Sequence, residues 1–295
     1  MGHWHGDELD RDAVLARIGY TGDTAPTPAT LAALHRAYAT SIPFENLDIL
    51  IDRPIRLDVE SLQDKMIHRR HGGYCFEHAA LFAALLESLG YRFSALIGRV
   101  TLGAPPHNRP ATHALLLVEF ADGARYLCDV GFGRGPLEPL ELVDGATVDQ
   151  DGWRLRLTGP QTGDDAAAVL PVADWALWQR TSVDGEVGWV DRHRFPLAPK
   201  FPIDFAVASH FVSTSPRSPF TMRPFVQRFT PERHDTLDGD TVTTIAPDGR
   251  IVETRTVAVE ELPQLLADVF DIDLDDDEAR ALVAAVPGLP GLTPR

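Results

Sequence analysis

The spacing of hydrophobic residues changes near residue 90 of this chain of 295 residues. Before that point apolar residues recur every three or four positions, which predicts helices. The runs expected to be helical are Asp10–Ile18, Ala29–Thr40 and Cys75–Leu89. From about 91 to 190, apolar residues alternate in short runs broken by Gly, Pro and Asp, as in an antiparallel sheet or small barrel. The chain is therefore expected to be an α+β protein with its first helices before its strands.

The same alternation locates individual strands. The runs expected to be strands are Phe93–Val100, Ala114–Phe120, Tyr126–Val130, Trp153–Thr158, Phe225–Phe229, Thr241–Ile245 and Arg250–Val257. Three prolines within Phe195–Pro202 predict a boundary there. Two further helices are expected at about 260–270 and 275–286.

Composition limits the functions that such a chain can have. Its net charge of −16 argues against sequence-independent binding to nucleic acid, so small-molecule substrates are expected. No run approaches the roughly 18 apolar residues of a membrane span, and the N-terminus does not resemble a secretory signal. Two cysteines cannot form a disulfide framework, which favours reduced thiols in the cytoplasm.

Cys75 is the first candidate catalytic residue. It follows Gly72, Gly73 and Tyr74 and begins an apolar run of helical period. Two glycines permit a sharp turn, and the free N–H groups of a helix N-terminus stabilise a thiolate. Although a free cysteine is usually a small buried hydrophobic residue, this placement favours a nucleophile.

His113 and Asp129 lie on two runs that predict a β-hairpin across the turn 121–123. A three-residue loop would place Glu119 opposite Arg125, a favourable pair of charges. The same register makes His113 and Asp129 diagonal neighbours on one face. An aspartate within an apolar strand needs a partner, and a histidine oriented by a carboxylate can activate a thiol. Cys75, His113 and Asp129 therefore form a candidate cysteine-protease-like Cys–His–Asp triad.

The segments around these residues resemble motifs of the arylamine N-acetyltransferase family, in its bacterial type. In chain order the matching segments are Ile42–Leu47 (IPFENL), Gly72–Glu77 (GGYCFE), Thr112-His113, Asp129–Gly133 (DVGFG) and Ser213–Phe220 (STSPRSPF). Their order agrees with the family across about residues 10–230. Five ordered motifs are a far more specific signal than the spacing of the triad alone.

The resemblance implies a fold, a reaction and a set of site residues. The fold would be an N-terminal helical bundle (1–90) carrying Cys75, a central antiparallel β-barrel (91–195) carrying His113 and Asp129, and a C-terminal α/β lid (196–295). The reaction would be acetyl-CoA-dependent N-acetylation of arylamines and arylhydrazines, a reaction of xenobiotic metabolism, through an acetyl-cysteine intermediate. The acetyl-CoA contacts would be Thr112, Gly131, Phe132, Gly133 and Arg134, with Arg217 also near the phosphates, and the acceptor contacts Phe44, Phe132 and Phe220.

Acetyl-CoA is expected as the acyl donor, with no metal cofactor, and the oligomeric state is left open between monomer and homodimer. His71, Cys75 and His78 have a spacing reminiscent of a metal site, but the sequence offers no clear fourth ligand for zinc. The chain also departs from the family, which usually has Arg where His71 stands and often Asn and Gly where Ala79 and Arg134 stand.

Other functions remain open at this point. An amide synthase that closes a macrolactam from a carrier-bound acyl chain shares the fold and triad. A cysteine protease or transglutaminase also uses Cys, His and Asp. A small-molecule binding protein with an inert triad is the non-enzymatic alternative, and an unreactive thiol at Cys75 would favour it.

Overall fold

The computed structural model describes residues 2–102, 104–160, 174–183 and 186–289. Its first part is helical, as expected. The helices are α1 (Arg11–Arg17), α2 (Pro28–Ser41), α3 (Leu47–Leu50), α4 (Val59–Gln63) and α5 (Cys75–Ser88). The ends of the three predicted helices are correct to within one residue. Thr27 caps α2 by accepting a hydrogen bond from the N–H of Thr30, and Pro28 takes a position where its missing N–H costs nothing.

Strands β1–β8 form one antiparallel sheet that curls into a nearly closed barrel. Their bounds are β1 (Arg92–Val100), β2 (His113–Glu119), β3 (Arg125–Cys128), β4 (Leu140–Glu141), β5 (Thr147–Gln150), β6 (Trp153–Thr158), β7 (Trp175–Val183) and β8 (Glu186–Phe195). Their order in the sheet is β4-β3-β2-β1-β8-β7-β6-β5. A core rich in leucine fills the space inside it, including Leu96, Leu115 and Leu177.

The register of the β2–β3 hairpin agrees with the prediction. Glu119 lies opposite Arg125, and Leu116 lies opposite Cys128. The predicted strand Tyr126–Val130 was too long, however, because β3 ends at Cys128. At Asp129 the chain leaves the ladder and bends through Gly133, which has φ +87°. Asp129 is thus freed from strand pairing and can approach side chains of other elements.

The C-terminal part contains α6 (Pro202–Thr214) and a second sheet. This sheet has the order β12-β11-β10-β9, with β9 (Phe225–Phe229), β10 (His234–Asp238), β11 (Thr241–Ile245) and β12 (Ile251–Thr256). Helices α7 (Leu262–Phe270) and α8 (Asp276–Ala285) follow. Sequence analysis missed α6, because Pro202 was interpreted as a boundary although it begins the helix, and because the apolar residues of α6 form no single stripe.

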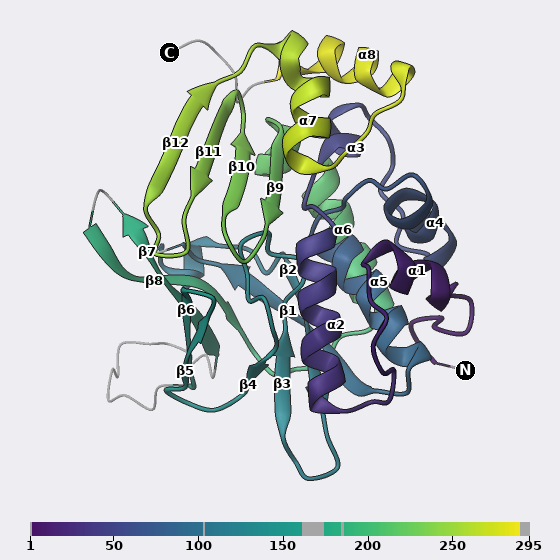
Figure 1. The fold of residues 1–295 in the computed structure, drawn as a ribbon, viewed down its shortest axis with the longest axis vertical. Coiled ribbons are helices and arrows are strands. Elements are labelled where there is room, and N and C mark those ends of the chain that lie inside the picture. Colours follow the sequence, from purple (N-terminus) through teal and green to yellow (C-terminus); the bar gives the residue numbers. More distant parts are fainter. Residues whose placement is uncertain (1, 103, 161–173, 184–185, 290–295) are drawn as a thin grey trace.

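Figure 1 shows how the parts meet. Helices α1, α2, α4 and α5 lie on one side, the large sheet on the other, and β9–β12 with α7 and α8 at one end. The largest core cluster joins the N-terminal helices to the large sheet and to α6, since it contains Val14, Phe76, Ala95 and Phe205. The fold class expected from the sequence is confirmed, while the boundaries 1–90, 91–195 and 196–295 stay a prediction. Within the described residues, no helix has both the length and the apolar character that crossing a membrane requires.

Candidate active site

The thiol of Cys75 lies at the first residue of α5, which is the central buried helix. Only 4% of Cys75 is exposed, and its Sγ atom lies 3.5 Å from the carbonyl oxygen of Thr112. The turn before it requires glycine, because a Cβ on Gly72 would lie 2.1 Å from the carbonyl oxygen of Pro43. The sharp turn predicted from the sequence therefore places the thiol at the free N–H groups of the helix.

His113 links the thiol to a carboxylate. Its Nε2 atom lies 3.0 and 3.1 Å from the two carboxylate oxygens of Asp129. Burial alone would lower the pKa of His113, but the charge and hydrogen bond of Asp129, with a smaller contribution from a hydrogen bond to Cys75, raise it to about 10. Burial likewise opposes the charge of Asp129, yet His113 and His193 hold the pKa of Asp129 well below its ordinary value. The three predicted residues therefore form one connected group.

Two further histidines hold Asp129, and sequence analysis missed both of them in this role. His193, on β8, donates from Nε2 to a carboxylate oxygen of Asp129 at 2.9 Å. His35, on α2, accepts the main-chain N–H of Asp129 at 3.1 Å, while its Nδ1 atom donates to the carbonyl of Leu137 at 2.9 Å. Burial lowers the pKa of His35 to about 4, so it is neutral and its tautomer is fixed by these two bonds. No spacing in the sequence links these distant positions.

A buried cluster of charges fixes the segment before α5. The ammonium group of Lys65 lies 3.0 Å from Glu45, 2.9 Å from Asp48 and 2.9 Å from Glu77. Burial opposes the charge of Lys65, but the three carboxylates raise the pKa of Lys65 well above its ordinary value. The other oxygen of Glu77 accepts the main-chain N–H of Tyr74 at 3.0 Å. The cluster therefore ties the segment around Glu45 to the start of the nucleophile's helix.

A cavity of about 710 Å³ opens onto the thiol. Of the residues predicted to bind substrates, six line it: Phe44, Thr112, Gly131, Phe132, Arg217 and Phe220. Cys75, His113 and Arg192 also contribute to its wall, whereas Gly133 and Arg134 do not. Gly131 packs directly on the nucleophile, because a Cβ there would lie 2.9 Å from the Cα of Cys75. The structure thus brings Cys75, His113 and most predicted contacts to one cavity.

The structure does not bring together the three residues whose spacing in the sequence is reminiscent of a metal site. His71 contacts the carbonyl of Asp273 at 3.1 Å, whereas His78 contacts the carbonyl of Pro43 at 3.1 Å. His113, Asp129 and His193 instead place one ligand atom each within 4.8 Å of one another. The hydrogen bonds between these three residues already account for their arrangement, and the expectation of no metal cofactor stays a prediction.

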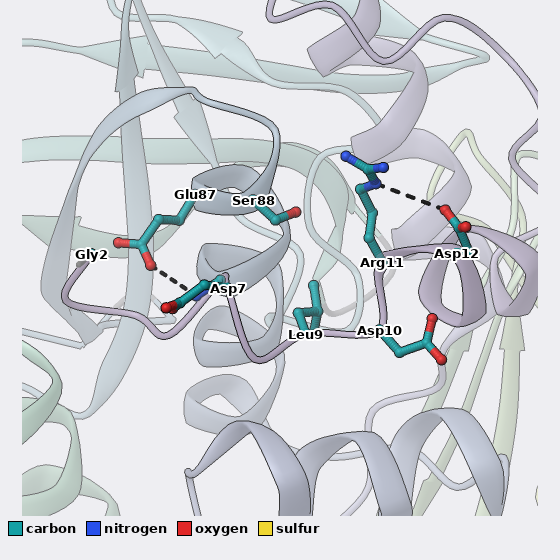
Figure 2. Close-up of a pocket in the computed structure, with 9 residues that line it drawn as sticks. Gly2, Asp7, Leu9, Asp10, Arg11, Asp12, Glu87 and Ser88 are labelled. Atoms are coloured by element: carbon teal, nitrogen blue, oxygen red, sulfur yellow. Dashed lines mark hydrogen bonds and ion pairs between the residues drawn. The ribbon is translucent and has the colours of Figure 1, made fainter.

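A second hollow, of about 720 Å³, lies between the N-terminal segment and the end of α5, and it contains none of the triad residues (Figure 2). The carboxylate of Glu87 accepts the main-chain N–H of Gly6 at 2.9 Å and thereby holds the segment against α5. Asp7, Asp10 and Asp12 also line the hollow. It offers no residue of nucleophilic type beyond the hydroxyl of Ser88.

Comparison with known proteins identifies the family. Residues 27–279 match a family model described as N-acetyltransferase. An arylamine N-acetyltransferase of Escherichia coli is 33% identical over 264 residues, which cover 89% of this chain and 88% of that protein. The chain belongs to the arylamine N-acetyltransferase family.

Solved structures of arylamine N-acetyltransferases agree with this assignment. The Nocardia farcinica enzyme is 51% identical, with 95% of each chain covered and a TM-score of 0.87. The Mycobacterium marinum enzyme in complex with CoA is 32% identical and covers 95% of this chain and 99% of that one, with a TM-score of 0.83. The predicted family and fold are confirmed, and the protein is an acyltransferase by family. The amide synthase, protease, transglutaminase and inert-binder alternatives are not favoured.

Proposed function

We propose that this protein transfers the acetyl group of acetyl-CoA to arylamines and arylhydrazines by a ping-pong mechanism in which Cys75 carries the acetyl group. The observation that supports this most directly is the connected group of Cys75, His113 and Asp129, of which Cys75 and His113 lie in the wall of a single cavity. Members of the same family supply the donor and acceptor classes, including one solved in complex with CoA.

In the first half-reaction His113 accepts the proton of Cys75, and the sulfur attacks the thioester carbonyl of acetyl-CoA. Asp129 keeps Nε2 of His113 protonated, which leaves Nδ1 for the thiol. The free N–H groups at the first turn of α5 would stabilise the oxyanion. The bond between the carbonyl carbon and the CoA sulfur then breaks, and the departing thiolate takes the proton from His113.

In the second half-reaction the nitrogen of the acceptor attacks the carbonyl of acetyl-Cys75. His113 removes a proton from that nitrogen, and the carbon–sulfur bond to Cys75 breaks. An arylamine suits this step because it is unprotonated, and therefore nucleophilic, at neutral pH. Phe44, Phe132 and Phe220 line the cavity and are the proposed contacts of the aromatic ring.

For acetyl-CoA we propose Thr112, Gly131 and Phe132, all of which line the cavity, as contacts of the thioester end. The phosphates are better assigned to Arg217 and Arg109, because both line the cavity and are exposed, whereas Arg134 is 8% exposed and does not line it. Arg217→Glu is expected to raise the KM for acetyl-CoA, while Arg250→Glu, at an exposed turn, should not change it. Equal effects of the two variants would contradict this assignment.

Steady-state kinetics test the proposed mechanism. Initial rates measured against acetyl-CoA at several fixed concentrations of an arylamine should give parallel double-reciprocal lines, because CoA leaves before the acceptor reacts. Intersecting lines would show that both substrates must be bound together and would overturn the ping-pong mechanism. No acetylation of any arylamine would overturn the proposed function itself.

A further inference from the structure

Gln227 is a buried amide in the wall of the active-site cavity. It lies on β9, in the C-terminal sheet, and is 6% exposed. Phe44 and Phe132, two of the proposed contacts of the acceptor ring, line the same cavity but belong to segments far apart in the sequence. Gln227 forms hydrogen bonds with both of these segments. A buried polar side chain is costly unless its bonds are made, so each partner of Gln227 is informative.

The main chain of Gln227 fixes the position of Phe44. The N–H of Phe44 donates to the carbonyl of Gln227 at 2.9 Å, and the N–H of Gln227 donates to the carbonyl of Phe44 at 2.8 Å. This exchange of two hydrogen bonds is an antiparallel bridge, and Phe44 also forms a parallel bridge with Gly73. Strand β9, the segment of Phe44 and the turn before Cys75 therefore lie side by side.

The side chain of Gln227 reaches the loop that carries Phe132. Its Nε2 atom donates to the carbonyl of Phe132 at 3.4 Å. A Cβ on Gly133 would lie 2.2 Å from the same Nε2 atom, so the amide packs closely on this loop. In the part of the chain that the structure describes, no other hydrogen bond reaches the main chain of residues 131–133. Since glycines flank Phe132 on both sides and leave the backbone free to move, Gln227 is the polar anchor of this loop.

Neighbouring residues on β10 fix the orientation of the amide. Because Nε2 of Gln227 donates to Phe132, its Oε1 atom accepts, and it does so from Nε2 of His234 at 2.9 Å. The hydroxyl of Thr236, which lies opposite Gln227 in the ladder, donates to Nδ1 of His234 at 3.3 Å. Burial and the charges of two nearby arginines lower the pKa of His234 well below its ordinary value, so the ring is neutral. A neutral imidazole has one donor and one acceptor, which these two partners satisfy.

We propose that Gln227 is a positioning residue that sets the spacing between Phe44 and Phe132 and thereby limits the width of the aromatic amines that are acetylated. This inference rests on the proposed function, because it takes these two rings as contacts of the acceptor. The main chain of Gln227 holds the segment of one ring, and its amide holds the loop of the other. One residue of the C-terminal sheet thus links two walls of the acceptor site.

The amide of Gln227 matters for Phe132 rather than for Phe44. Replacing the side chain keeps the main-chain bridge to Phe44 but removes the hydrogen bond to the carbonyl of Phe132. The ring of Phe132 lies edge-on to His113, with ring centroids 5.0 Å apart, so a movement of this loop changes the space beside the catalytic histidine. A less firmly held loop should admit a wider ring and orient a narrow one less well.

The test compares two amines of different width, 4-methylaniline and 3,5-dimethylaniline. In a ping-pong mechanism kcat/KM for the acceptor reports only the second half-reaction, and kcat/KM for acetyl-CoA reports only the first. In Gln227→Met, kcat/KM for 4-methylaniline should fall on the order of 5-fold, the usual effect of losing a hydrogen bond between neutral groups. The values for 3,5-dimethylaniline and for acetyl-CoA should each change by less than about 2-fold.

Two further variants complete the comparison. His234→Phe removes the donor that orients the amide, and it should change the ratio between the two amines in the same direction with a smaller effect. Gln264→Met is the matched control, because it makes the same substitution at an exposed position of α7. It should leave the ratio unchanged.

Each alternative outcome is distinguishable. Equal losses of kcat/KM for both amines in Gln227→Met would overturn the proposal, because Gln227 would then only support the fold. A loss confined to acetyl-CoA would overturn it in favour of a role in binding the donor. If Gln227→Met does not fold, His234→Phe provides the same comparison, and an unchanged ratio there overturns the proposal. A wild-type protein that acetylates neither amine would overturn the proposed function, and this inference with it.

Discussion

The Nε2 atom of His193 lies 2.9 Å from a carboxylate oxygen of Asp129. His193 has no exposed surface, and burial lowers its pKa, so it is a neutral donor to Asp129. Asp129 therefore receives one hydrogen bond from His113 and another from a residue far away in the sequence. We interpret His193 as a positioning residue that fixes the carboxylate which orients His113.

Replacing His193 tests this role. His193→Phe should lower kcat/KM on the order of 10-fold, because a buried carboxylate loses a donor. The acid limb of the pH profile should also move to higher pH, since the negative charge of Asp129 is less stabilised. His193→Gln, which keeps an N–H donor, should restore much of the activity. Equal losses of kcat/KM in His193→Phe and His193→Gln, with an unchanged pH profile, would mean that His193 contributes only to packing.

Asp129→Asn should reduce stability in a pH-dependent way. Folding raises the pKa of His113 to about 10, whereas in the unfolded chain this pKa is about 6.5. The protonated His113 therefore contributes its full stabilisation below about pH 6.5, and this contribution is lost as the pH rises through about 10. The difference in unfolding free energy between wild type and Asp129→Asn should thus shrink between pH 6 and pH 10, on the order of 1 kcal/mol or more. Urea unfolding measures it, with the exposed Asp7→Asn as the control. A difference that is constant with pH would contradict the charge pairing.

Gly131→Ala should disturb the nucleophile directly. The new Cβ would lie 2.9 Å from Cα and 3.0 Å from the carbonyl oxygen of Cys75, so backbone must move. A displacement of this kind should lower kcat on the order of 10-fold or more. Gly188→Ala is the matched control, because no atom lies within 4 Å of the new Cβ there. Similar rates for both variants in an acetylation assay would show that the contact with Gly131 does not position Cys75.

Lys65→Met should destabilise the protein by about 3–5 kcal/mol, because it leaves buried Glu45, Asp48 and Glu77 without their cation. Lys200→Met is the control, since Lys200 takes part in no ion pair among the described residues, and it should change stability by less than about 0.5 kcal/mol. Urea unfolding compares the two variants. Equal unfolding free energies for Lys65→Met and Lys200→Met would mean that the charge cluster makes no net contribution to stability.

Local sequence patterns predicted much of the site but not the residues that hold the catalytic groups in position. The Gly-Gly turn and the cross-strand pair of Glu119 and Arg125 are short-range features, so the position of Cys75 and the hairpin register followed from neighbouring residues. The site also depends on contacts that span many residues of the chain: His35 and His193 with Asp129, and Lys65 with Glu77. No periodicity in the sequence connects the members of these pairs. The early end of β3 also escaped prediction, because Asp129 forms hydrogen bonds outside the ladder with His35 and His193, which are both far away in the sequence.

The acetyl-cysteine intermediate is the central claim, and intact-mass measurement tests it most directly. The purified protein is mixed with acetyl-CoA in the absence of an acceptor, and peptides are then analysed to locate any adduct. We expect one acetyl group on Cys75, removed when an arylamine is added, and no adduct in Cys75→Ala. No adduct on the wild-type protein, or an acetyl group located elsewhere and retained after the amine is added, would contradict the account.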